Sequence, residues 1–159
     1  MLRRQSIAKD PGNGGRRGNN IIEFTLMVPW YIFLFAGTFD FGFYSYALIA
    51  AQDAARTGAA YCATDGTKAA DAANACTQYV IPQLKYLPNI GSAVTTCAGS
   101  PLTVTAVLLN SGSTPASPDG QPATKVTVTY VTPQLIPIPG LLPGQITITK
   151  AVTMRLRSP

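Results

Sequence analysis

Between Phe24 and Phe39 the chain has sixteen consecutive residues without a charged side chain, and many of them are aromatic. A helix needs about 20 apolar residues to cross a bilayer, and the run reaches that length with the apolar residues that flank it. Helix-forming residues continue to about Cys62, so one helix over 20–63 would be roughly 66 Å long. The hydrocarbon core takes up about 30 Å of this length. We therefore predict a transmembrane helix at 19–63 whose second half leaves the membrane as a stalk.

The basic residues are concentrated before this helix. Five basic and one acidic side chain lie up to Gly18, whereas the other 141 residues carry seven basic and six acidic ones. Basic residues before an apolar helix mark its cytoplasmic flank, while nucleic-acid binding needs them spread over a folded face. The pattern predicts a single-pass membrane protein, with its N-terminus in the cytoplasm and no nucleic-acid partner. Residues 1–18 read as a solvated basic leader, either removed after Gly18 or kept as a tail.

Two residues inside the apolar run are unusual for a membrane helix. Glu23 places a carboxylate near its start, where full burial in the bilayer costs about 2.5–3.5 kcal/mol. It is a candidate for assembly through charge pairing; the alternative is an acid without a special role. Pro29 lacks an amide hydrogen and its ring clashes with the carbonyl of Thr25, so we expect a kink or a locally melted turn.

The second half of the helix combines polar and small side chains. Gln52 and Asp53 lie four and three residues before Arg56 and can contact it on one side of the helix. A set of small residues recurs at helical spacing and would allow another helix to come close. These small residues are Ala51, Ala55, Gly58 and Ala59.

Three cysteines, Cys62, Cys76 and Cys97, follow the apolar run. If this part is exported, two of them are expected to form a disulfide, for which we favour Cys76–Cys97; three small buried thiols remain the alternative. The chain has no His and no CxxC, so we expect no metal site and no cofactor. The lack of His also excludes Ser-His and Cys-His catalytic pairs, so we predict that the protein is not an enzyme.

Residues 64–159 are predicted to form an extracytoplasmic α+β domain. A short second helix is expected from Lys68 to about Leu84, capped by Asp65 or Thr67 and ended by Pro82 and Pro88. Alternating residues predict strands at 102–109, 125–132 and 145–156, with Lys150 out of pattern in the last. The fold class is thus α+β, with a long helix, a short helix and a small antiparallel sheet. The apolar segment 133–144 either covers the sheet or forms a contact surface.

Several of these features occur together in one known family. Gly18 followed by four residues and then Glu23-Phe24 looks like a prepilin processing site. Residues 23–29, 39–42 and 52–59 together resemble the TadE-like pseudopilins of bacterial tight-adherence, or Flp-type, pili. Within these motifs the resemblance marks five positions for helix packing or family identity. They are Asp40, Gly42, Gln52, Arg56 and Gly58.

The resemblance implies a mechanism. A prepilin peptidase would cut between Gly18 and Asn19, leaving Glu23 as the fifth residue of the mature chain. The new α-ammonium of Asn19 would then pair with Glu23 of a neighbouring subunit. The implied partners are other pilins and pseudopilins, and whether this minor subunit enters the fibre, caps it or stays in the membrane is left open. A membrane-tethered binding domain with an uncleaved anchor is the alternative function.

Overall fold

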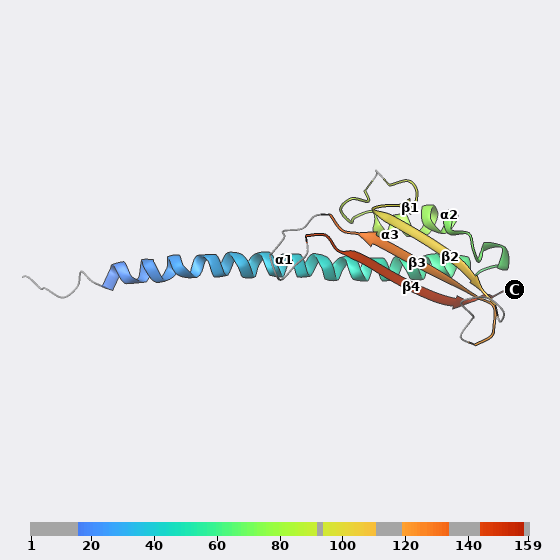
Figure 1. The fold of residues 1–159 in the computed structure, drawn as a ribbon, viewed down its shortest axis with the longest axis horizontal. Helices are drawn as coiled ribbons and strands as arrows, with labels where there is room; N and C mark the ends of the chain where they lie inside the picture. Colours follow the sequence, from blue (N-terminus) through green and yellow to red (C-terminus); the bar gives the residue numbers. More distant parts are fainter. Residues whose placement is uncertain (1–15, 92–93, 111–118, 134–143, 158–159) are drawn as a thin grey trace, which may run out of the picture. The chain divides into compact units, whose positions relative to one another are not determined.

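The computed structural model describes residues 16–91, 94–110, 119–133 and 144–157, with side chains from residue 21 onward (Figure 1). Its contacts divide the chain into two units, with the boundary between Phe39 and Asp40. The longest element is α1, Arg16–Cys62, which contributes to both units. By its contacts, the stalk half of α1 therefore belongs with the C-terminal domain. Most of the apolar segment 133–144 lies outside the described residues. Its predicted role, covering the sheet or forming a contact surface, therefore stays a prediction.

The helix α1 continues through Pro29 without interruption. The melted turn that we considered at this proline is therefore not formed. Because Pro29 has no amide hydrogen, the carbonyl of Thr25 loses its helical donor. A long apolar helix tolerates such a proline when nearby groups satisfy the freed backbone atoms.

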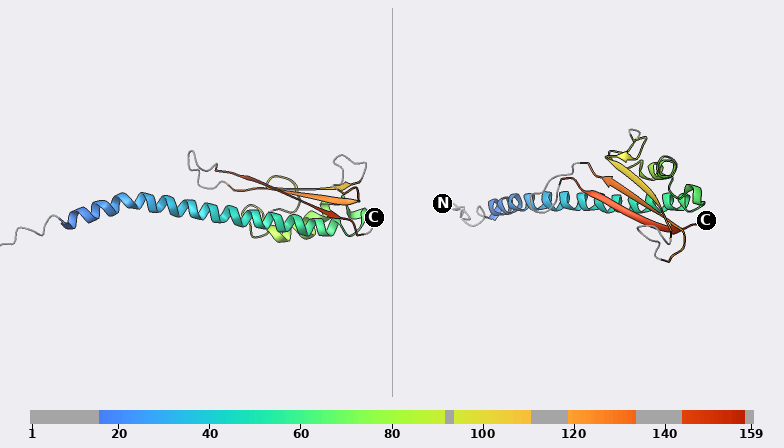
Figure 2. Two further views of the ribbon diagram at one scale, coloured as in Figure 1. Left: turned by 90° about the horizontal axis from the view of Figure 1, so that it is seen from below. Right: turned by 45° about the vertical axis from the view of Figure 1, so that its right-hand side comes forward.

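One face of the second half of α1 is buried and is made of small residues. Small side chains let the neighbouring backbone approach closely. The prediction that another helix would use this face was incomplete, because strands of the sheet also pack on it. Figure 2 shows the sheet lying along one side of this part of α1. The fully buried positions are Ala47, Ala51, Ala54, Ala55, Ala59 and Cys62.

The predicted second helix forms in several short pieces. They are η1 (Gly66–Lys68), α2 (Ala72–Asn74), η2 (Ala75–Val80) and α3 (Ile81–Leu84). As predicted, Asp65 caps the first piece, by accepting from the amide of Thr67 at 3.2 Å.

The main part of this helical segment begins at Ala72, and not at Lys68 as we predicted. A second N-cap residue, Asp71, precedes it. The carboxylate of Asp71 accepts from the side chain of Asn74 at 2.7 Å and from its backbone amide at 3.1 Å. These bonds lower the pKa of Asp71. They also satisfy an amide that the start of a helix leaves without a partner.

Contrary to our prediction, the helical segment does not end at Pro82 but continues to Leu84. A π-helical turn precedes this proline. The element η2 is a π-helix, and the amide of Ile81 donates to the carbonyl of Cys76 five residues earlier. Proline is accepted in the first turn of a helix, where its missing amide hydrogen is not needed. The following piece, α3, has Pro82 at this position.

Four strands form an antiparallel sheet in the order β1-β2-β3-β4. Their bounds are Ala98–Gly99, Leu102–Leu109, Ala123–Val131 and Thr147–Arg155. The three long strands agree with the predicted ones to within a few residues, while β1 was not foreseen. The register places Lys150 opposite Val128, whose side chain is in the core, so Lys150 lies on the inner face of an edge strand. Inward charges of this kind oppose edge-to-edge aggregation.

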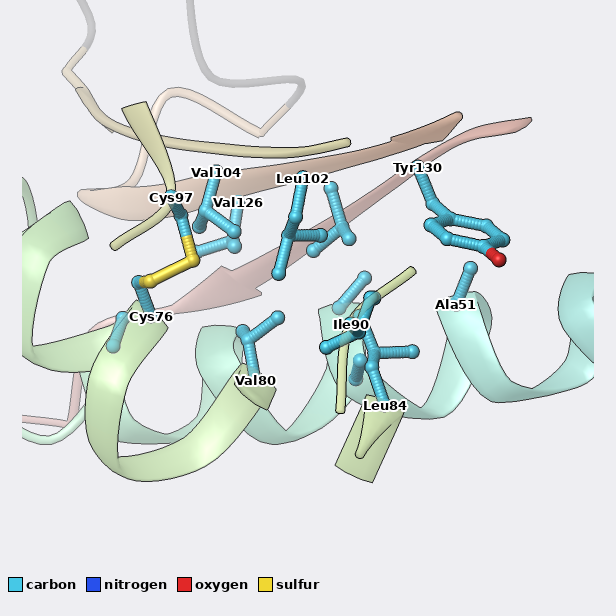
Figure 3. Packing of buried hydrophobic residues seen from close by; sticks show 14 of the residues in the cluster. Ala51, Cys76, Val80, Leu84, Ile90, Cys97, Leu102, Val104, Val126 and Tyr130 are labelled. Atoms are coloured by element: carbon cyan, nitrogen blue, oxygen red, sulfur yellow. A yellow bond between two sulfur atoms is a disulfide. The ribbon is translucent and has the colours of Figure 1, made fainter. Parts of the chain in front are cut away.

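The core lies between the sheet, α1 and the segment 72–84 (Figure 3). The side chains of Val126 and Tyr130 point from the sheet toward the helices, and both are fully buried. The hydroxyl of Tyr130 donates to the carbonyl of Pro88 at 2.8 Å. That of the buried Thr124 donates to the carbonyl of Ala69 at 2.6 Å. Both polar groups are therefore satisfied, as buried groups must be.

A disulfide joins Cys76 of η2 to Cys97, next to β1, with their Cα atoms 6.0 Å apart. Figure 3 shows this bond connecting the helical segment to the edge of the sheet. Cys62 is a buried free thiol. At the other end of the sheet, the amide of Arg157 donates to the carbonyl of Ala63 at 2.9 Å, which ties the last residues to the end of α1.

Candidate functional site

The first half of α1 exposes every large apolar side chain that it carries. From Ile21 to Phe39 all twelve Ile, Leu, Met, Phe, Trp and Tyr side chains are between 43% and 77% exposed. Soluble monomers rarely expose a continuous apolar surface of this size. By length and hydropathy this is the one helix in the described residues that could cross a membrane, within Ile21–Cys62. The finding is consistent with a single membrane anchor.

Glu23 lies on this apolar surface, one turn after the predicted cleavage site. Its side chain is exposed and lies beside Phe24, Met27 and Tyr31. No ion pair or hydrogen bond to the Glu23 carboxylate is formed by the side chains that the structure describes. A carboxylate among aromatic groups needs a cation or a proton once the surroundings become apolar. Among the described side chains, the Glu23 carboxylate therefore has no partner.

Gly18 and Asn19 lie in the first turn of α1, which begins at Arg16. This turn contains no acidic residue, while Arg16 and Arg17 stand at its start. Positive charges at a helix N-terminus oppose the helix dipole.

Asp40 and Gly42 are adjacent in the sequence but have opposite surroundings. Asp40 is only 4% exposed, and its Oδ2 atom has no hydrogen-bond partner among the described residues. Gly42 is exposed, and a Cβ added there would have nothing within 4 Å. Sequence reasoning did not foresee that Asp40 is buried, since an aspartate between two phenylalanines gives no signal of which side it faces.

The polar residues of the stalk lie on its solvent side. Asp53 Oδ1 and Arg56 Nη1 are 3.9 Å apart, and both side chains are more than half exposed. Such an exposed pair contributes a few tenths of a kcal/mol. Gln52 is half-buried beside them.

Gly58 lies on the opposite side of α1 from this pair, and it is buried. An added Cβ would lie 3.2 Å from Val80 and 3.4 Å from Val126. The predicted motif positions therefore divide into outward-facing and core positions, and the structure does not bring them together as one site. No cluster of metal-ligating side chains is found in the described ranges.

An exposed apolar helix that continues into an α+β domain defines a class of proteins anchored by one N-terminal helix. The model of the TadE-like protein family matches residues 21–60. This match confirms the predicted resemblance: residues 21–60 are similar to the TadE-like family, and this similarity implies a Tad/Flp pilus-associated protein. Glu23 and the five motif positions lie inside the matched segment, while Gly18 and Asn19 precede it. Neither a curated protein nor a solved structure matches the chain.

Proposed function

We propose that this chain is a minor pseudopilin of a Flp/Tad-type pilus, processed by a prepilin peptidase and held in a bacterial inner membrane before assembly. One observation carries the proposal: the first half of α1 exposes all its large apolar side chains around Glu23, whose carboxylate has no partner among the described side chains. Membrane lipid can cover the apolar side chains but cannot neutralise the acid. A neighbouring subunit can do both.

The first step is removal of the basic leader between Gly18 and Asn19. A peptidase needs an extended substrate, and the two arginines make the first turn of α1 costly to keep helical. Gly18 offers the peptidase a backbone without a Cβ. The cut converts the amide of Asn19 into an α-ammonium at the end of the apolar helix.

The second step is pairing of this ammonium with Glu23 of a neighbouring subunit. An ion pair in an apolar environment gains little over two hydrated charges, but an unpaired buried charge is strongly unfavourable. The pair therefore acts mainly on register, since a subunit shifted along its neighbour leaves both charges unpaired. With the leader on the cytoplasmic side, the C-terminal domain lies in the periplasm.

The test separates the two steps. In cells with an active peptidase, mass spectrometry of the wild-type chain should find Asn19 as the N-terminus. Gly18→Val should leave the leader attached, whereas Glu23→Gln should be cleaved normally but fail to associate with the other pilins. Asp53→Asn is the matched control, because it removes a carboxylate from the solvent side of the same helix. A wild-type chain that keeps its leader, or normal assembly of Glu23→Gln, contradicts the proposal.

The alternative function, a tethered binding domain with an uncleaved anchor, has one observation in its favour. The Gly18–Asn19 bond lies within α1 and outside the family match at 21–60. Retention of the leader in wild-type cells would support this alternative.

A further inference from the structure

The surroundings of α1 change at one residue. From Ile21 to Phe39 no side chain of the helix is buried, whereas Asp40 is only 4% exposed and is the first buried residue among the side chains that the structure describes. The contacts divide the chain at the same place, between Phe39 and Asp40. Asp40 is also the first charged residue after Glu23. Burial, contacts and charge therefore mark the same residue as the end of the exposed apolar segment.

The part of α1 that follows Asp40 is unsuited to the hydrocarbon of a bilayer. Ala47 and Ala51 are fully buried in a core that includes side chains from β2, β3 and β4. The outward positions of β4 include the exposed hydroxyl residues Thr149 and Thr153. Open sheet edges do not occur among lipid tails, because their backbone groups would have no partner there. Water and protein, and not lipid tails, therefore surround the part of α1 on which the sheet packs.

We propose that the surface of the hydrocarbon core crosses α1 at Asp40, so that lipid tails cover Ile21–Phe39 and the C-terminal domain begins directly at the membrane surface. The 19 residues from Ile21 to Phe39 give a length of about 28 Å at 1.5 Å per residue. This length agrees with a hydrocarbon thickness of about 30 Å. Phe41, Tyr44 and Tyr46 follow within two turns, and aromatic side chains are enriched at this depth of a membrane.

The boundary at Asp40 also sets the depth of the other end of the helix. Glu23 precedes Asp40 by 17 residues, or about 26 Å along the axis, and so lies inside a hydrocarbon core of about 30 Å. Asn19 precedes it by 21 residues, or about 32 Å. A tilt of about 20° shortens both distances by roughly 2 Å and leaves Asn19 at the boundary. The Glu23 carboxylate is thus held in the apolar layer, while the Gly18–Asn19 bond stays within reach of water.

A boundary farther along α1 fits the structure less well. If the next charged residue, Asp53, marked it, the roughly 20 residues of the span would be 33–52. The hydrocarbon would then enclose Ala47 and Ala51 together with the sheet that packs on them. Glu23 would lie in water, which would satisfy its carboxylate without a charged partner. The inference rests on the membrane location in the proposed function, but it is independent of leader cleavage and of pilus assembly.

Cysteine labelling at positions one turn apart tests the boundary. Thr38 and Gly42 are exposed, lie four residues apart on the same side of α1 and flank Asp40. In spheroplasts that contain the full-length chain, a membrane-impermeant maleimide should label Gly42→Cys and leave Thr38→Cys unlabelled until detergent is added. Leu34 and Tyr46 extend the same exposed side in both directions. Leu34→Cys should be protected like Thr38→Cys, and Tyr46→Cys should be labelled like Gly42→Cys.

The opposite boundary supplies a second pair with the same spacing. In inverted membrane vesicles the maleimide should label Asn19→Cys but not Glu23→Cys. All these replacements are made in a Cys62→Ala chain, which removes the free thiol. The other two cysteines are joined in the disulfide and do not react with maleimide.

The outcomes separate this inference from the proposed function. Labelling of Thr38→Cys without detergent, or protection of both Gly42→Cys and Tyr46→Cys from either side of the membrane, overturns the boundary at Asp40. Labelling of Gly42→Cys in inverted vesicles alone, with Thr38→Cys protected, supports the boundary but refutes the orientation in the proposed function. Release of the wild-type chain from membranes by alkaline carbonate overturns both.

Discussion

The disulfide between Cys76 and Cys97 gives the most direct test of how the domain is held together. The bond closes a loop with a sequence separation of 21 residues. Closing a loop of this size in the unfolded chain removes entropy worth about 3.3 kcal/mol at 25 °C in the chain-entropy model. We expect the Cys76→Ala, Cys97→Ala double variant to lose this amount of unfolding free energy. For a domain of this size the melting temperature should fall on the order of 10 °C.

The assay is thermal unfolding of the full-length protein in detergent, with and without a reductant. The reductant should lower the wild-type melting temperature to near that of the double variant, and it should have no effect on the double variant itself. Cys62→Ala is the control, because it removes the free thiol and should keep the full response to reductant. Coincident melting of oxidised and reduced wild-type protein would refute the argument, since a bond without effect cannot restrict the unfolded chain.

Three further predictions concern the core. Gly58→Leu should cost about 1–3 kcal/mol through overpacking, while Gly42→Leu, on an open part of the same helix, should leave the melting temperature unchanged or higher. Thr124→Val should lower the unfolding free energy by about 1 kcal/mol, measured by urea denaturation, because it removes a buried hydrogen bond. Burial raises the pKa of Tyr130 to about 12, so its neutral form stabilises the fold fully below pH 10 and loses this effect as the pH rises through 12. The stability gap between wild type and Tyr130→Phe should therefore narrow over that pH range.

The elements that could be predicted from the sequence are those whose pattern repeats. The alternation in residues 145–156 predicted a strand because every second side chain except Lys150 is apolar, and β4 covers Thr147–Arg155. Lys150 is the exception to this alternation, yet it lies on the inner face of the sheet, opposite Val128. The register with Val128 outweighs the preference of one side chain, since a slip by one residue would turn the whole apolar face to solvent.

The features that the sequence did not indicate depend on contacts between distant residues. The two residues of β1 form a strand only because β2 lies beside them. The widening of η2 ahead of Pro82, like the burial of Asp40, is also a tertiary outcome. The small residues of α1 could be recognised as a packing face, but alanines do not encode whether their partner is a strand, a helix or another subunit.

The distribution of side-chain size along α1 limits where assembly contacts can form. Its small face, from Ala47 to Ala59, is fully buried by the chain's own sheet and helices. A neighbouring subunit cannot reach that face without displacing the domain core. The large side chains from Ile21 to Phe39 are exposed in the described part of the chain. If the chain assembles as proposed, subunit contacts along α1 would use this first half, or the exposed side of the stalk that carries Asp53 and Arg56. The first half is also where Glu23 lies, so the proposed charge pairing and the exposed apolar side chains fall on one segment.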